Sequence, residues 1–131
     1  MATATGTFEV RPGGETAYHE ADGGARLTHA NGTQRFTGDI EGEGSIEWLM
    51  CYLPAGGARL VGLQFVSGSI GGRSGTVVLD AVGDHDGKGS RATWHIVEGS
   101  GSGDLTGIRG RGSFEAPGGA TVTYQLEYQF D

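Results

Sequence analysis

Four polar residues interrupt apolar runs in the middle of expected strands, and side-chain chemistry is most readily expected there. They are Glu47, Gln64, Asp80 and His95. Glu47 stands between Ile46 and Trp48. A carboxylate held in an apolar lumen would have a raised pKa and could act as an acid or a base near neutrality. The alternative is that Glu47 faces solvent or pairs with an arginine on a neighbouring strand.

The other three polar residues carry a similar choice. As a neutral imidazole, His95 could shuttle a proton, or it could be an exposed or merely hydrogen-bonded side chain. Asp80 is open to the same two interpretations as Glu47. Gln64 could orient a ligand carbonyl or could face an interface. On the chemical interpretation, Glu47, His95 and Asp80 are the candidate catalytic residues.

Aromatic residues define the expected binding surface more than charges do. Together with Gln64, the candidate ligand-binding residues are Trp48, Tyr52, Phe65, Trp94, Tyr124 and Tyr128. They could line a cavity for a flat or extended apolar molecule, or they could fill the core, because small barrels often pack their interiors solid. Strict alternation places Glu47 on the opposite face from Trp48 and Tyr52. Both faces can touch one ligand only if a bulge intervenes or one residue lies at the rim.

The glycine-rich stretch 99–112 lacks the spacing of a phosphate-binding loop. Such a loop needs glycines at fixed offsets, a following helix N-terminus and usually a lysine. Ile108 stands where the lysine would be, and Asp104 would repel a phosphate. Similar glycine patterns occur twice earlier in the chain. The sequence therefore predicts repeated corners of a β-meander, with a short helical turn at "GDLTG" (103–107).

No metal and no organic cofactor are expected. The segment "DHDG" (84–87) resembles part of a calcium loop but lacks the glutamate that would close it. The four histidines show no close pairing of the kind that zinc sites use. Cys51 lies mid-strand, and a buried inert thiol is its default interpretation.

Composition limits the class of protein. The chain has 131 residues, 27 of them glycine, and a net charge of −7, which predicts one domain over residues 1–131. The acidic balance argues against nucleic-acid and anionic membrane partners, which need a basic surface. A single cysteine and a first segment without signal-peptide features favour a reducing compartment. No apolar run approaches the roughly 20 residues of a membrane span. We therefore expect a soluble, cytoplasmic protein.

Alternation with period two predicts an all-β fold. The clearest case is "TVTYQLEYQF" (121–130), in which every second residue is apolar. Further strands are expected at 7–11, 15–21, 25–38, 42–54, 58–70, 73–84, 89–98 and 109–116. Glycine-rich turns connect them, and no segment has a helical period. About eight antiparallel strands in a chain of this length predict a small closed β-barrel, with a sandwich as the alternative.

The central strands are apolar on both faces. In "SIEWLMCYL" (45–53), Trp48 and Met50 share one side while Leu49 and Cys51 share the other. A solvated sheet face would be polar. One side must fill the barrel and the other must meet a second surface, so we expect a homo-oligomer.

Several motifs, in this order, resemble a known family. They are "GTFEV" (6–10), "FTGDIEGEGSIEWLMCY" (36–52), "LVGLQFVSGSIGGRSGTVVL" (60–79), "GSGDLTGIRGRGSF" (101–114) and "YQLEYQF" (124–130). The chain is similar to a bacterial family of unknown function whose fold resembles allene oxide cyclase. The resemblance covers nearly the whole chain and implies an eight-stranded antiparallel barrel with a central cavity. Plant allene oxide cyclases, dirigent proteins and some bacterial cyclases of specialised metabolism have barrels of this general shape.

One departure from the family pattern concerns a Gln-His pair that follows a Val-Leu near residue 82. Asp80 and Ala81 stand at those positions here. If the family histidine has a role, His85 or His95 could take its place.

The functional expectation is a cofactor-independent cyclase or isomerase that positions a small apolar or aromatic molecule in the lumen and excludes water. The alternative is a non-catalytic carrier or sensor with the same pocket. A third interpretation, a structural protein with a solid core, predicts no cavity at all.

Overall fold

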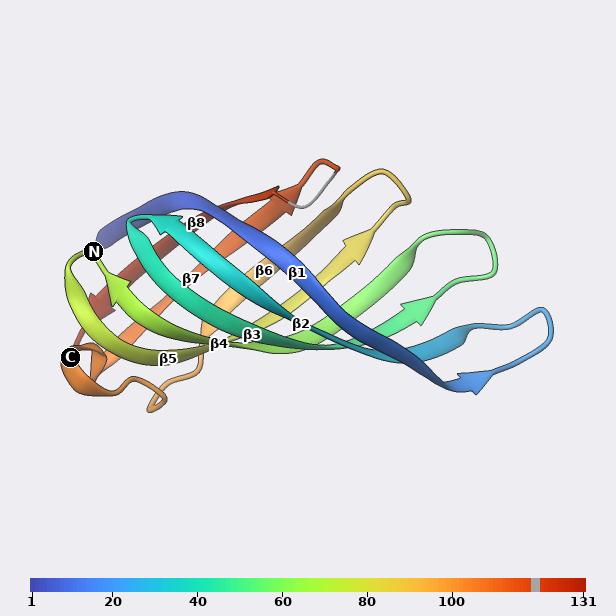
Figure 1. Cartoon of the computed structure of the whole chain (residues 1–131), viewed down its shortest axis with the longest axis horizontal. Helices are drawn as coiled ribbons and strands as arrows, with labels where there is room; N and C mark the ends of the chain where they lie inside the picture. The colour runs from blue at the N-terminus through green and yellow to red at the C-terminus, as the bar shows by residue number, and fades with distance from the viewer. Residues whose placement is uncertain (119–120) are drawn as a thin grey trace.

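The computed structural model describes residues 1–118 and 121–131 and consists of eight strands (Figure 1). They are β1 (Ala2–Glu20), β2 (Arg26–Gly38), β3 (Ile40–Tyr52), β4 (Ala58–Ile70), β5 (Arg73–His85), β6 (Ser90–Ile96), β7 (Ile108–Ala116) and β8 (Thr121–Phe130). Each strand pairs with the next in antiparallel register, and β1 pairs with β8 to close the barrel. The predicted all-β class and the closed antiparallel barrel are confirmed, and the sandwich alternative is wrong.

The two ends of the barrel differ (Figure 1). The hairpin connections β1–β2, β3–β4 and β5–β6 extend beyond one end, which we call the mouth. Both chain termini lie at the opposite end, which we call the closed end, together with a short 3₁₀ turn, η1 (Gly103–Leu105). This turn confirms the helical turn predicted at 103–107. Leu105 on it is buried and covers the closed end.

The first strand is longer than predicted, because the segments expected at 7–11 and 15–21 form one strand. Its pairing with β2 shifts between Pro12 and Gly14 and again between Ala17 and His19. Such a shift is a β-bulge, which inserts an unpaired residue and lets the strand continue with its alternation changed. The strand therefore passes through the "PGG" segment instead of turning there.

Alternation sorts residues between lumen and exterior as the sequence predicts for β8. Val122, Tyr124, Leu126 and Tyr128 are buried, whereas Thr121, Thr123 and Gln125 are exposed. The main hydrophobic core is formed by the inward-facing residues of the strands together with Leu105. None of the helical structure in residues 1–118 and 121–131 is long and apolar enough to cross a membrane.

Glycines permit a close approach of β3 and β4 near the closed end. A Cβ atom added at Gly68 would collide with the backbone oxygen of Glu41 and lie 2.8 Å from Cα of Gly42. Gly42 itself has φ +148°, which L-residues with side chains rarely adopt. Only glycine at these two paired positions allows the backbones to pass so closely.

Candidate ligand-binding pocket

The closed half of the lumen is filled by an aromatic cluster. It comprises Phe8, Phe36, Trp94, Phe114 and Tyr124, whose ring centroids lie between 5.0 and 6.5 Å apart where they pack. These separations are those of favourable aromatic packing. This half of the lumen therefore has the solid interior that one interpretation of the sequence allowed.

Hydrogen bonds fix the polar atoms of this cluster. Trp94 Nε1 donates to Gln64 Oε1 at 2.6 Å, and both side chains are fully buried. The Tyr124 hydroxyl donates to the carbonyl of Thr37 at 2.8 Å and accepts from the backbone N–H of Ile40 at 2.9 Å. Burial raises the pKa of Tyr124. These contacts tie β8 to the β2–β3 corner.

The mouth half of the lumen contains a cavity of about 470 Å³. Its walls are mostly apolar, and its lining residues are Phe8, Val10, Pro12, Glu15, Ala30, Ile46, Trp48, Met50, Leu60, Ser90, Phe114, Ala116 and Val122. The volume falls within the range of about 300–1,000 Å³ that is typical of small-molecule sites. A larger groove of about 860 Å³ crosses the closed end, but charged, hydroxyl and glycine residues line most of it. The mouth cavity is therefore the better candidate for an apolar ligand.

The bulge in β1 places Glu15 at this cavity. Up to Pro12, even-numbered residues such as Phe8 and Val10 face the lumen. Because the pairing skips Gly13, Glu15 then pairs with the lumen-facing Ala30. Asn31 Oδ1 accepts a hydrogen bond from the backbone N–H of Gly14 at 3.0 Å, which holds the bulge. Without the bulge Glu15 would point outward.

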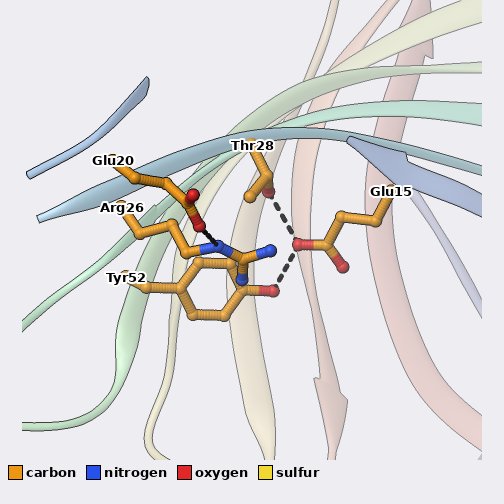
Figure 2. Close-up of polar contacts among 5 residues, drawn as sticks. All are labelled: Glu15, Glu20, Arg26, Thr28 and Tyr52. Atoms are coloured by element: carbon orange, nitrogen blue, oxygen red, sulfur yellow. Dashed lines mark hydrogen bonds and ion pairs between the residues drawn. The ribbon is translucent and has the colours of Figure 1, made fainter. Parts of the chain in front are cut away.

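Glu15 is held as a carboxylate by two neighbours (Figure 2). The Tyr52 hydroxyl donates to Glu15 Oε2 at 2.6 Å, and Thr28 Oγ1 donates to the same oxygen at 2.7 Å. The Tyr52 hydrogen bond, followed by that of Thr28, lowers the pKa of Glu15. Burial and the adjacent carboxylate raise the pKa of Tyr52 to about 12. At neutral pH the mouth therefore carries an ionised Glu15 and a neutral Tyr52.

A charged pair, Arg26 and Glu20, lies beside this group at the mouth. Arg26 Nε donates to Glu20 Oε1 at 2.8 Å, and its guanidinium lies 5.5 Å from the centre of the Tyr52 ring (Figure 2). The charge of Arg26 further lowers the pKa of Glu15. Two carboxylates, Glu15 and Glu20, lie beside the single guanidinium of Arg26, so this group carries an excess of negative charge.

The mouth carries another polar pair on β5 and β6. His85 Nδ1 and Ser90 Oγ are 2.7 Å apart, and Ser90 lines the cavity. The sequence analysis names His85 as a residue that could replace a family histidine, and the structure places it at the mouth. His95, the other such residue, lies elsewhere.

The expected lumen position of the three candidate catalytic residues is wrong. The side chains of Glu47, Asp80 and His95 are 60%, 45% and 58% exposed on the outer surface. Glu47 Oε1 lies 2.9 Å from His29 Nε2, and Asp80 Oδ1 lies 3.4 Å from His95 Nδ1. For Glu47 the structure supports the solvent-facing alternative, with a histidine as partner instead of the expected arginine. A catalytic role for these residues stays a prediction, without the apolar surroundings on which it was based.

The candidate ligand-binding residues divide into three groups. Trp48 lines the mouth cavity, and Tyr52 lies at its rim. Gln64, Trp94, Tyr124 and Tyr128 are buried and do not line the cavity. Phe65 is 44% exposed on the outer face, so its expected place in the lumen is wrong. Cys51 is half-buried instead of fully buried.

The structure adds site residues that the sequence analysis does not single out. Glu15, Thr28 and Ser90 lie in polar segments, so no interrupted apolar run marks them. The "PGG" signal of a bulge before Glu15 is the one local clue, because a bulge changes which residues face inward. In residues 1–118 and 121–131, no group of three or more His, Cys, Asp or Glu side chains is arranged to hold a metal ion.

Comparison with known proteins places the chain in a family. Residues 4–128 match DUF3224, a family described as proteins of unknown function. The chain belongs to the DUF3224 family. It is also similar to a solved DUF3224 structure of unknown function from Shewanella oneidensis MR-1, with 29% identity and a TM-score of 0.86. That similarity covers 100% of this chain and 98% of the Shewanella chain, and no curated protein matches. The predicted membership of a bacterial family of unknown function is confirmed, whereas the likeness to allene oxide cyclase stays a prediction.

Proposed function

We propose that this DUF3224 protein binds a small apolar molecule in the mouth half of its barrel. The observation that carries the proposal is an apolar cavity of about 470 Å³ with one ionised carboxylate at its opening. Trp48, Met50 and Phe114 offer aromatic and thioether surface to the apolar part of the ligand. The filled closed half limits how deep the ligand reaches.

The Glu15 carboxylate favours a ligand with a positively charged or hydrogen-bond-donating head. Oε2 already accepts from Tyr52 and Thr28, whereas Oε1 receives no hydrogen bond from the residues drawn in Figure 2. A charged N–H donor forms a stronger hydrogen bond with a carboxylate than a neutral donor does. A protonated amine on an apolar body fits this mouth best.

Binding without chemistry is favoured over catalysis. A carboxyl with a lowered pKa is a poor proton donor at neutral pH, and Glu47, Asp80 and His95 point away from the lumen. Cyclisation or isomerisation is the second proposal, and one observation favours it: Glu15 is ionised beside an apolar cavity, which is the protonation state that a general base requires.

Titration calorimetry with three ten-carbon probes tests the proposal. Decylamine should bind the wild type more tightly than decanol, and decanoate should bind most weakly. Glu15→Gln should cost decylamine about tenfold in affinity, or about 1.4 kcal/mol, and should reduce the difference between the probes. Glu47→Gln is the matched control, since Glu47 is also a glutamate on a barrel strand but is exposed on the outer surface and does not line the cavity.

Trp48→Ala distinguishes the contribution of the apolar cavity from that of the ligand head group, because it should weaken the binding of all three probes alike. If none of the probes binds the wild type, the pocket proposal is wrong. If all three bind equally well and Glu15→Gln changes nothing, the assigned role of Glu15 is wrong.

A further inference from the structure

The outer surface of β3, β4 and β5 carries a continuous group of exposed apolar side chains. We define this outer patch as Leu49, Val61, Leu63, Phe65 and Val82. Each of these side chains is between 44% and 54% exposed. Monomeric proteins often expose single apolar residues, whereas a contiguous apolar group on the surface is often functional.

The strand register makes the outer patch continuous. Leu49 pairs with Val61, which pairs in turn with Val82, so these three form one row across the three strands. Leu63 and Phe65 follow on β4 in the next two outward positions. Side chains directly opposite one another on adjacent strands lie about 4.5–5.5 Å apart at Cβ. The five therefore form one surface.

Pairs of polar side chains within the chain border the outer patch. They are His29–Glu47 at 2.9 Å, His95–Asp80 at 3.4 Å and Arg59–Asp84 at 3.4 Å. An apolar centre with a polar rim is the usual anatomy of a protein interface. Each carboxylate at the border already has a polar side-chain partner, so a covering surface need not bury a carboxylate alone.

We propose that a second copy of this chain covers the outer patch in a two-fold dimer. Half-exposed side chains of these types present on the order of 400 Å² of apolar surface per copy. Two such patches contribute on the order of 800 Å², and the polar rims would supply the rest of the roughly 1,000 Å² expected of a specific interface. Identical sheets also have identical twist, so two copies pack face to face in the aligned arrangement that twisted sheets favour. The net charge of −7 disfavours an anionic membrane or nucleic acid as the covering surface.

Analytical ultracentrifugation over micromolar to millimolar concentrations tests this proposal. The wild type should sediment with twice the mass of the 13.5 kDa chain. Leu63→Glu should weaken the dimer at least about 100-fold, because the two-fold symmetry buries two new carboxylates. Leu53→Glu is the matched control. Leu53 is also a leucine and is 45% exposed, but it lies in the β3–β4 connection beyond the Arg59–Asp84 pair.

Circular dichroism establishes that each variant is folded, and Phe65→Glu provides an independent disruption if Leu63→Glu is unstable. A monomeric wild type at every concentration would overturn the proposal. So would a dimer that both glutamate variants of the outer patch leave intact, or one that Leu53→Glu disrupts equally.

Discussion

The two halves of the lumen are built from the same strands but use them differently. In the closed half, large rings meet across the barrel: the ring centroids of Phe8, Phe36 and Trp94 lie within 6.5 Å of one another. In the mouth half, small inward residues such as Ala30, Ser90 and Ala116 stand among the lining residues and leave a cavity. The strand scaffold is common to both, so side-chain volume decides where the barrel is solid and where it is hollow.

The polar groups of the two halves also differ. At the closed end, the Tyr124 hydroxyl is satisfied by backbone groups and serves packing. At the mouth, the Tyr52 hydroxyl donates to a carboxylate that remains partly open to solvent. The Tyr124 hydroxyl therefore stabilises the packing of the closed half, whereas the Tyr52 hydroxyl keeps the Glu15 carboxylate ionised at the mouth. The variants below test this division.

Replacing each of the two tryptophans in turn should give the largest difference in the free energy of unfolding. Trp94→Ala should lower the free energy of unfolding by about 3–5 kcal/mol, because it empties the fully buried cluster and leaves Gln64 without its partner. Trp48→Ala should cost about 1–2 kcal/mol, because that ring is only half-buried beside a cavity. Urea unfolding followed by far-ultraviolet circular dichroism measures both. Equal losses would contradict the division into a solid half and a hollow half.

Loosening the β1 bulge should affect the mouth but not the closed half. Asn31→Ala removes the acceptor for the Gly14 N–H and should cost about 1 kcal/mol. Glu15 should then be less firmly placed, and its pKa should rise toward its ordinary value of 4.5. Carboxyl-carbon NMR titration follows Glu15. Asn31→Asp retains an acceptor and should preserve the placement. An unchanged Glu15 titration in Asn31→Ala would show that the bulge does not depend on this contact.

Tyr52→Phe should change the pH dependence of stability more than stability itself. Because the pKa of Glu15 is lowered by folding, its ionised form stabilises the protein above about pH 4.5, and this contribution is lost as the pH falls through the folded pKa. Because the pKa of Tyr52 is raised to about 12, its contribution is complete below pH 10 and is lost between pH 10 and 12.

In the variant, the alkaline loss should disappear and the Glu15 titration should move upward toward pH 4.5. The change in unfolding free energy at neutral pH should be less than about 1 kcal/mol, since solvent screens the site. Unfolding measured across the pH range supplies the comparison with the wild type. Tyr18→Phe is the control, because Tyr18 is 59% exposed. Identical pH profiles for wild type and Tyr52→Phe would contradict the assigned hydrogen bond.

The smallest effect is expected for the exposed pair outside the lumen. Glu47→Gln should change the free energy of unfolding by no more than about 0.5 kcal/mol, because both Glu47 and His29 are largely solvated. Amine binding at the mouth should not change. A large loss of probe binding in this variant would indicate that Glu47 contacts the ligand and would contradict its assignment to the outer face.

Much of the barrel could be predicted because its signals are local. Glycine-rich turns and period-two alternation mark the strand boundaries, and most observed strands lie within two residues of the predicted ones. The face of each residue was harder to predict in the central strands. The sequence correctly predicts that Glu47 and Trp48 lie on opposite faces. Phe65 and Leu79 are both apolar, yet Leu79 is buried in the lumen and Phe65 is exposed on the outer face. Hydrophobicity cannot distinguish inside from outside when both faces are apolar.

Most of the candidate site could not be predicted from local sequence patterns. Glu15 is separated from Thr28 by 13 positions and from Tyr52 by 37, and these contacts exist only across paired strands. A one-residue bulge turns Glu15 inward, and its effect on facing depends on the register with β2.

The sequence by itself determined the all-β class and most of the strands and turns, because backbone preference and alternation act over a few neighbouring residues. Closure depends on the pairing of β1 with β8 from opposite ends of the chain. Only the tertiary structure decided which face became the lumen, how far aromatic rings filled it and which carboxylate reached the mouth. Those outcomes depend on strand register and on the volumes of side chains that meet from distant parts of the chain.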